Sequence, residues 1–209
     1  MTFVLKPKAG IAACVILFAL VLLLGLAVTA GWGHQLDATI GTAIGMREGQ
    51  TPEHQIAFWR FISWTGTGPQ RYIFVTALAL WLGFARRWQY GAGFAAASLL
   101  SVATSEYLKH AFHRARPEIV PHLDFTSNFA YPSGHATSAA VVYLLFALLV
   151  PAQKRAGWFL AAAILMALTG YSRIALGVHW FSDVIGGWML GGFFAIAMAC
   201  LLERVEGKS

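Results

Sequence analysis

A series of long apolar runs constrains this chain more than any other feature of its sequence. Hydrophobic residues make up 58% of the 209 positions and charged residues only 11%, whereas a soluble domain has about 25% charged residues. The first run, residues 11–30, has the length of one transmembrane helix. Although Val28-Thr29-Ala30 resembles a signal-peptide cleavage site, the run exceeds the usual apolar core of such a peptide, so we interpret it as a retained helix. The sequence therefore predicts an integral membrane protein.

Five further apolar segments bring the number of predicted spans to six. They cover residues 72–85, 90–112, 136–150, 157–176 and 184–202. The shortest is flanked by Arg71 and Arg86, whose long side chains can reach the membrane interface from a short helix. We therefore predict an all-α fold, a polytopic membrane bundle of six transmembrane helices that forms a single domain over residues 1–209.

The segment between the first two spans is too polar to lie in the bilayer. Thr51, Pro52 and Glu53 form a helix-start signature with a capping residue, a first-turn proline and an early acid. The aromatic residues that follow are too few for a span, so we expect a short interfacial helix over residues 52–64 that lies against head groups or covers a cavity. A plain connector is the alternative.

The distribution of charge predicts an orientation in the membrane. The chain carries 15 Lys and Arg against 9 Asp and Glu, but it has no basic tail, repeat or Arg-rich helix to bind nucleic acid. If six helices alternate, the short loops on one side contain Lys6, Lys8, Arg86, Arg87, Lys154, Arg155, Arg204 and Lys208. By the positive-inside rule, that side faces the cytoplasm.

Polar and ionisable side chains, which are unfavourable near hydrocarbon, fall on the opposite side and come from three separate segments. They are Lys109, Arg114, Arg116, His135, Arg173, His179 and Asp183. Ionisable groups near hydrocarbon are rare without a function. Asp183 follows His179 by four residues, a spacing that stacks two side chains on one helix face and lets the Asp accept the ring N–H. An ordinary ion pair at a helix end is the alternative for this pair alone.

Two further clusters suit a bound anion. Lys109 and Arg116 together fit a dianionic phosphate, and Pro117 forces Arg116 out of helical geometry. The run Tyr131-Pro132-Ser133-Gly134-His135 stands at the start of a predicted span, where a helix N-terminus offers free N–H groups to an anion.

Together these motifs resemble those of the type 2 phosphatidic acid phosphatase superfamily, which also includes the vanadium haloperoxidases. The family pattern is Lys, six residues, Arg-Pro; then Pro-Ser-Gly-His; then Ser-Arg, five residues, His, three residues, Asp. All positions match, at residues 109–117, 132–135 and 172–183. The resemblance points to the membrane lipid phosphatase branch of this superfamily.

The resemblance implies a role for each matched residue. His179 would attack phosphorus to give a phosphohistidine, Asp183 would orient its ring, and His135 would act as the general acid. The phosphate oxygens would be held by Lys109, Arg116, Ser133, Gly134 and Arg173. No metal or other cofactor is implied.

The remaining polar residues near the motifs have simpler interpretations. His110 and His113 lack an acidic or thiol ligand to complete a metal site, so they are expected to face solvent or lipid. Glu106 is expected to pair with Lys109. Solvated loop positions are expected for Arg114, Glu118, His122 and Asp124, and contact with a head group is the alternative. Cys14 and Cys200 are interpreted as packed thiols, and Gly186-Gly187 and Gly191-Gly192 as small residues for close helix packing.

The expected function is hydrolysis of the terminal phosphate of a membrane lipid at the outer face of the cytoplasmic membrane. Undecaprenyl diphosphate and phosphatidylglycerophosphate are favoured because the chain has little beyond the motifs to recognise a large head group; phosphatidic acid and the 1-phosphate of lipid A are alternatives. Two other functions fit the sequence less well. A vanadate-dependent peroxidase shares the motif residues but is expected to be a soluble protein, whereas this chain has apolar spans. A transporter or binding protein for head groups would need only the cationic residues, whereas this chain also has the nucleophile, the orienting Asp and the general acid. The oligomeric state is left open.

Overall fold

A computed structural model describes residues 7–66, 68–85, 88–126 and 129–206, and within these ranges the chain is all-α. The helices are α1 (Pro7–Thr29), α2 (His34–Ile44), α3 (Glu53–Thr65), α4 (Gly68–Ala85), α5 (Trp88–Phe112), α6 (Gly134–Leu149), the 3-10 turn η1 (Ala152–Lys154), α7 (Arg155–Ala175) and α8 (Phe181–Glu206). No strand occurs in the described part of the chain, which agrees with the predicted fold class.

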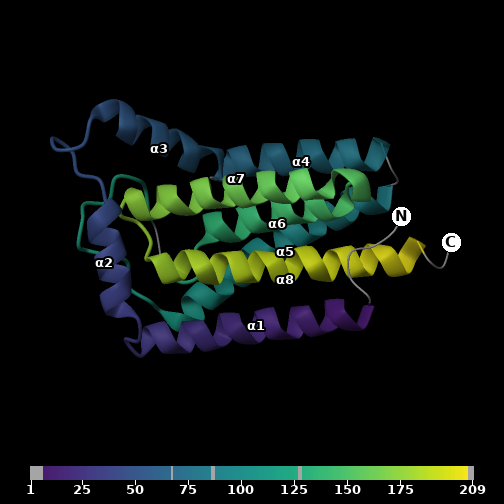
Figure 1. Ribbon diagram of the computed structural model, residues 1–209, viewed down its shortest axis with the longest axis horizontal. Coiled ribbons are helices and arrows are strands. Elements are labelled where there is room, and N and C mark those ends of the chain that lie inside the picture. The colour runs from purple at the N-terminus through teal and green to yellow at the C-terminus, as the bar shows by residue number, and fades with distance from the viewer. Residues whose placement is uncertain (1–6, 67, 86–87, 127–128, 207–209) are drawn as a thin grey trace.

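The long helices run side by side as a bundle (Figure 1). Helix α2 crosses one end of the bundle, α3 extends from that end beside α7, and the start of α1 and the end of α8 lie at the other end. Helix α3 confirms the short helix predicted over residues 52–64. Helix α2 was not predicted from the sequence.

In the described part of the chain, three helices are long and apolar enough to cross a membrane by themselves. These segments are Lys8–Thr29, Ala152–Ala175 and Phe181–Val205, and two shorter apolar helices cover Gln70–Ala85 and Gly134–Leu149. Helix α5 is less apolar and buries the serines Ser98, Ser101 and Ser105, as suits a helix packed among others. The structure is thus that of a helical membrane protein.

Helix α6 lies at the centre of the bundle and packs closely on α8. A Cβ added to Gly187 would lie 2.8 Å from the Cβ of Ala136, and one added to Gly191 would lie 2.5 Å from the Cβ of Ala140. Only glycine permits this approach, which confirms close packing for two of the four paired glycines. The contact also aligns the starts of α6 and α8, where Ser133 N–H donates to the Asp183 carbonyl at 3.0 Å.

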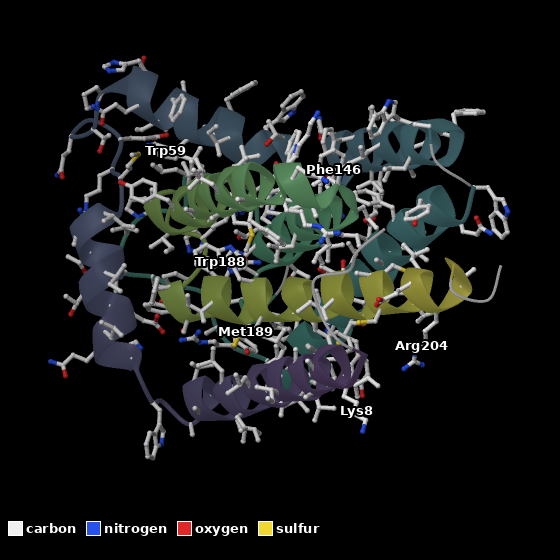
Figure 2. The ribbon with its side chains drawn as sticks, turned by 45° about the vertical axis from the view of Figure 1, so that its right-hand side comes forward. Lys8, Trp59, Phe146, Trp188, Met189 and Arg204 are labelled. Carbon is white, nitrogen blue, oxygen red and sulfur yellow. The ribbon has the colours of Figure 1, made fainter. Side chains whose placement is uncertain are left out.

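The basic residues of the predicted cytoplasmic side lie in part outside the described ranges, namely Lys6, Arg86, Arg87 and Lys208. Among the others, Lys8 and Arg204 lie at the same end of the bundle, away from α2 (Figure 2). The polar motifs lie at the α2 end.

Candidate active site

The centre of the site is a buried pair formed by His179 and Asp183. The side chains are 3% and 0% exposed, and His179 Nδ1 lies 3.4 Å from Asp183 Oδ2. The expectation that one helical face holds both is wrong, because His179 lies in the turn before α8. Gly177, at a φ of +74°, turns the chain there, and Asp183 Oδ2 also accepts the Trp180 N–H at 2.9 Å. The Asp therefore caps the helix and orients the His.

The other ring nitrogen of His179 faces a cation. Its Nε2 lies 3.3 Å from Arg116 Nη1. Burial, together with the positive charges of Arg116, Arg173 and Lys109, holds the pKa of His179 well below its ordinary value. The imidazole is therefore neutral at neutral pH, with a lone pair on Nε2 when Nδ1–H donates to Asp183.

Arg116 and Lys109 are brought to the site by the end of α5 and the segment after it. Arg116 Nη1 donates to the Val178 carbonyl at 2.6 Å, and burial, then repulsion by Arg173, lowers the pKa of Arg116 to about 10. Lys109 Nζ lies 2.6 Å from Glu106 Oε1, which confirms the predicted pair. A Cβ on Gly134 would lie 3.6 Å from that Nζ, so the lysine approaches the start of α6.

Arg173, in the last turn of α7, is held by two residues that come from other elements. Its Nη1 lies 2.5 Å from Asp124 Oδ2 and donates to the hydroxyl of Ser63 on α3. Asp124 is therefore not the solvated loop residue that was expected. Burial opposes its ionisation, but the charge of Arg173 and the hydrogen bond from Ser63 outweigh burial and lower the pKa of Asp124.

Arg114 also differs from its expected solvated position. It is 7% exposed and lies between two carboxylates, with Nη1 2.5 Å from Asp183 Oδ1 and Nη2 2.7 Å from Asp37 Oδ2. Asp37, on α2, is 2% exposed and also accepts the Ser182 N–H at 2.9 Å. Sequence reasoning missed Asp37. Its helical spacing from Ile40 and Ile44, which places an acid on an apolar face, was the available signal.

His135 and Ser133 lie at the N-terminus of α6. Ser133 Oγ accepts the Ala136 N–H at 3.5 Å and so caps the helix. The ring of His135 approaches the end of α3, since a Cβ on Gly66 would lie 3.1 Å from His135 Cδ2. Helix α3 thus adjoins the site through both Ser63 and Gly66.

Several buried polar atoms at this end of the bundle have no hydrogen-bond partner in the described parts of the chain. Four of them are Arg71 Nε, Ser105 Oγ, His135 Nε2 and Arg173 Nε. An unsatisfied buried polar atom costs about 1–3 kcal/mol. A bound ligand with several acceptor oxygens would supply the missing partners for the donors among them.

The two histidines near Lys109 lie apart from this site. His110 and His113 are exposed, and their rings pack at 5.7 and 4.5 Å from that of Phe129. No group of three or more His, Cys, Asp or Glu suited to a metal ion occurs among the described residues. Cys14 and Cys200 are free thiols.

Known proteins with similar sequences are phosphatases. "Phosphatidylglycerophosphatase B" of Bacillus subtilis is 36% identical over 93 residues, which cover 42% of this chain and 45% of that protein. "Lipid A 1-phosphatase" of Rhizobium etli is 35% identical over 106 residues, or 46% and 44% of the two chains. The chain thus spans less than half the length of these two relatives.

The similarity in structure extends further. The crystal structure of a transmembrane PAP2 type phosphatidylglycerolphosphate phosphatase from Bacillus subtilis superposes with a TM-score of 0.81 and 25% identity, over 92% of this chain and 96% of that one. A family model described as the PAP2 superfamily matches residues 87–206, the part that contains all three motifs. With these motifs joined in one site, the chain belongs to the PAP2 superfamily.

Proposed function

We propose that this protein is a lipid phosphatase that removes the terminal phosphate of a membrane lipid phosphate or diphosphate through a phosphohistidine. The observation that carries the proposal is the environment of His179, whose Nδ1 faces Asp183 and whose Nε2 faces Arg116. This arrangement fixes the tautomer and presents a lone pair toward a cation that would hold a phosphate. The catalytic domain is proposed to cover residues 1–209.

In the first step, the Nε2 lone pair of His179 attacks phosphorus. The bond between phosphorus and the leaving oxygen breaks, its electron pair passes to that oxygen, and His135 donates the proton that the oxygen takes up. Asp183 and Arg114 keep the ring of His179 in place while it becomes positively charged. The dephosphorylated lipid leaves, and the phosphoryl group remains on His179.

In the second step, water attacks the phosphohistidine. His135, now neutral, takes a proton from the water, the N–P bond breaks, and its electron pair returns to Nε2. Inorganic phosphate leaves. In both steps Lys109, Arg116 and Arg173, with the hydroxyl of Ser133 and the N–H of Gly134, would stabilise the nonbridging oxygens.

An apolar groove between α4 and α5 supports a lipid substrate. It has a volume of about 540 Å³ and runs from Tyr72 past Ala79 to Trp88. A smaller pocket shares Tyr72, Val75 and Leu99 with the groove and reaches Arg71 and Ser138. An acyl or prenyl chain in the groove would therefore place its head group at the motif end of the bundle.

The orientation follows from the positive-inside rule. We propose six spans, formed by α1, α4, α5, α6, α7 and α8, with both termini in the cytoplasm and the site at the outer face of the cytoplasmic membrane. Helix α3 would lie along the interface, with exposed Phe58, Phe61 and Trp64 toward the head groups.

The first test is a comparison of substrates. Purified protein in matched detergent is expected to release phosphate from undecaprenyl diphosphate or phosphatidylglycerophosphate faster than from phosphatidic acid, the 1-phosphate of lipid A or a soluble phosphate ester. Two of these lipids, phosphatidylglycerophosphate and the 1-phosphate of lipid A, are the substrates in the names of relatives. Turnover of the soluble ester as fast as every lipid would contradict a role for the groove, and no turnover at all would favour a transporter of head groups.

The second test is removal of metal ions. Three cationic side chains and a helix N-terminus surround the proposed phosphate position, so activity is expected to continue in excess chelator. Orthovanadate, which resembles the transferring phosphoryl group, is expected to inhibit. The measurement is phosphate release with and without chelator. An enzyme that chelator stops and Mg²⁺ restores would contradict the proposal.

A further inference from the structure

We propose that Arg71 binds an anionic phosphate on the leaving group, so that the enzyme prefers lipids in which a second phosphate remains after cleavage. This inference rests on the proposed phosphatase function and deepens it. The shared chemistry is a leaving group with its own negative phosphate, either a lipid monophosphate released from a diphosphate or a phosphodiester released from a glycerophosphate head group. Arg71 lies outside the three motifs.

The position of Arg71 is defined by its contact with α6. Its Nη1 donates to Ser138 Oγ at 3.2 Å. Ser138 follows His135 by three residues, so the two share a helix face, and Ser138 lies about 4.5 Å further along the helix axis. Helix α6 starts at the site and runs away from it. The guanidinium of Arg71 therefore lies further along the axis of α6 than His135, away from the end of the bundle that holds the motifs.

Arg71 is half-buried and differs from the buried Arg114 and Arg173 in its partners. Arg114 and Arg173 each contact a carboxylate. Within the described ranges, no carboxylate lies within ion-pair distance of Arg71, and its buried Nε has no hydrogen-bond partner. Its guanidinium carbon lies 5.0 Å from the centre of the Tyr72 ring, a contact that stabilises the charge less than a bound anion would.

The surroundings of Arg71 indicate which anion this is. Arg71 lies close enough to Lys109 and His135 for its charge to act on both. It also lines the small pocket that shares Tyr72 with the apolar groove. A lipid that runs from the groove to His135 therefore passes Arg71 just before the scissile bond.

In this place the leaving group of a diphosphate carries its remaining, negatively charged phosphate. When the bond between phosphorus and the bridging oxygen of a diphosphate breaks, the electron pair passes to the oxygen of the second phosphate. The forked guanidinium can bind that phosphate with two hydrogen bonds. A lipid monophosphate instead releases a neutral alcohol, which offers Arg71 no negative charge.

The test compares kcat/KM for two matched pairs of lipids in detergent. One pair is an isoprenyl diphosphate and the isoprenyl monophosphate, and the other is phosphatidylglycerophosphate and phosphatidic acid. Arg71→Gln is expected to lower kcat/KM about tenfold or more for the first member of one or both pairs, and no more than about twofold for the second member. The pair that responds identifies the leaving group.

The ratio within each pair is independent of how much of the variant is folded, so partial misfolding does not imitate the effect. Arg71→Lys keeps the positive charge but not the forked guanidinium, so its loss of kcat/KM is expected to be smaller. It provides the same ratio of kcat/KM values if Arg71→Gln fails to fold. Arg204→Gln, at the far end of α8, is the control and should leave both ratios unchanged.

The outcomes separate the two proposals. Equal losses on both members of each pair, or unchanged ratios in both variants, would overturn the assignment of Arg71 and leave the phosphatase intact. A wild-type protein that hydrolyses none of the four lipids would refute the proposed function itself.

Discussion

Replacing His179 with alanine is expected to lower phosphate release by about six orders of magnitude, the scale of loss when a hydrolase loses its nucleophile. The covalent route requires the lone pair on Nε2, which lies 3.3 Å from Arg116 Nη1. Asp183→Asn keeps the nucleophile but disturbs the tautomer of His179. The rate of phosphate release is therefore expected to fall by up to about four orders of magnitude. The measurement is single-turnover release of labelled phosphate from the preferred lipid.

Trapping the intermediate tests the same assignment directly. With labelled substrate, His135→Ala is expected to accumulate protein-bound phosphate because the neutral imidazole that activates water is missing. The wild-type protein should show little label at steady state, and His179→Ala should show none. Label that persists without His179 would contradict its role as nucleophile.

Replacing Arg114 with alanine is expected to destabilise the protein and to inactivate it. Asp37 and Asp183 would remain buried without their shared cation, and removal of one partner from a buried ion pair costs about 3–5 kcal/mol. A displaced Asp183 would no longer hold the ring of His179, and a misplacement of about 1 Å can lower the rate about 100-fold. The measurements are denaturant unfolding in detergent and kcat/KM.

An exposed ion pair provides the control for Arg114. Glu48 is 70% exposed and lies 3.2 Å from Arg60, so Glu48→Ala should cost no more than about 1 kcal/mol and leave activity unchanged. Equal effects of the two substitutions would show that the buried network has no special importance. A stable but inactive Arg114→Ala would separate its role in orienting Asp183 from its role in folding.

The sequence alone predicted the features that depend on local pattern. Apolar runs predicted the long helices because a helix buries its backbone polar groups within one segment, wherever its neighbours lie. The spacing of three residues between Glu106 and Lys109 predicted their contact, because residues three apart on a helix are neighbours on its surface. The three motifs predicted which residues meet, since their order and spacing match a known family.

Only the tertiary structure decided which distant residues complete the site. Asp37 is separated from Arg114 by 77 positions, Asp124 from Arg173 by 49, and Arg71 from Ser138 by 67. No helical period connects such pairs, and a lone Asp or Arg in a polar loop is usually solvated. Their contacts exist because α2 crosses the end of the bundle, and because the packing brings α4 to α6 at Ser138 and the segment before α6 to α7 at Arg173. There a buried charge requires a partner, and the partner comes from whichever element the packing brings near.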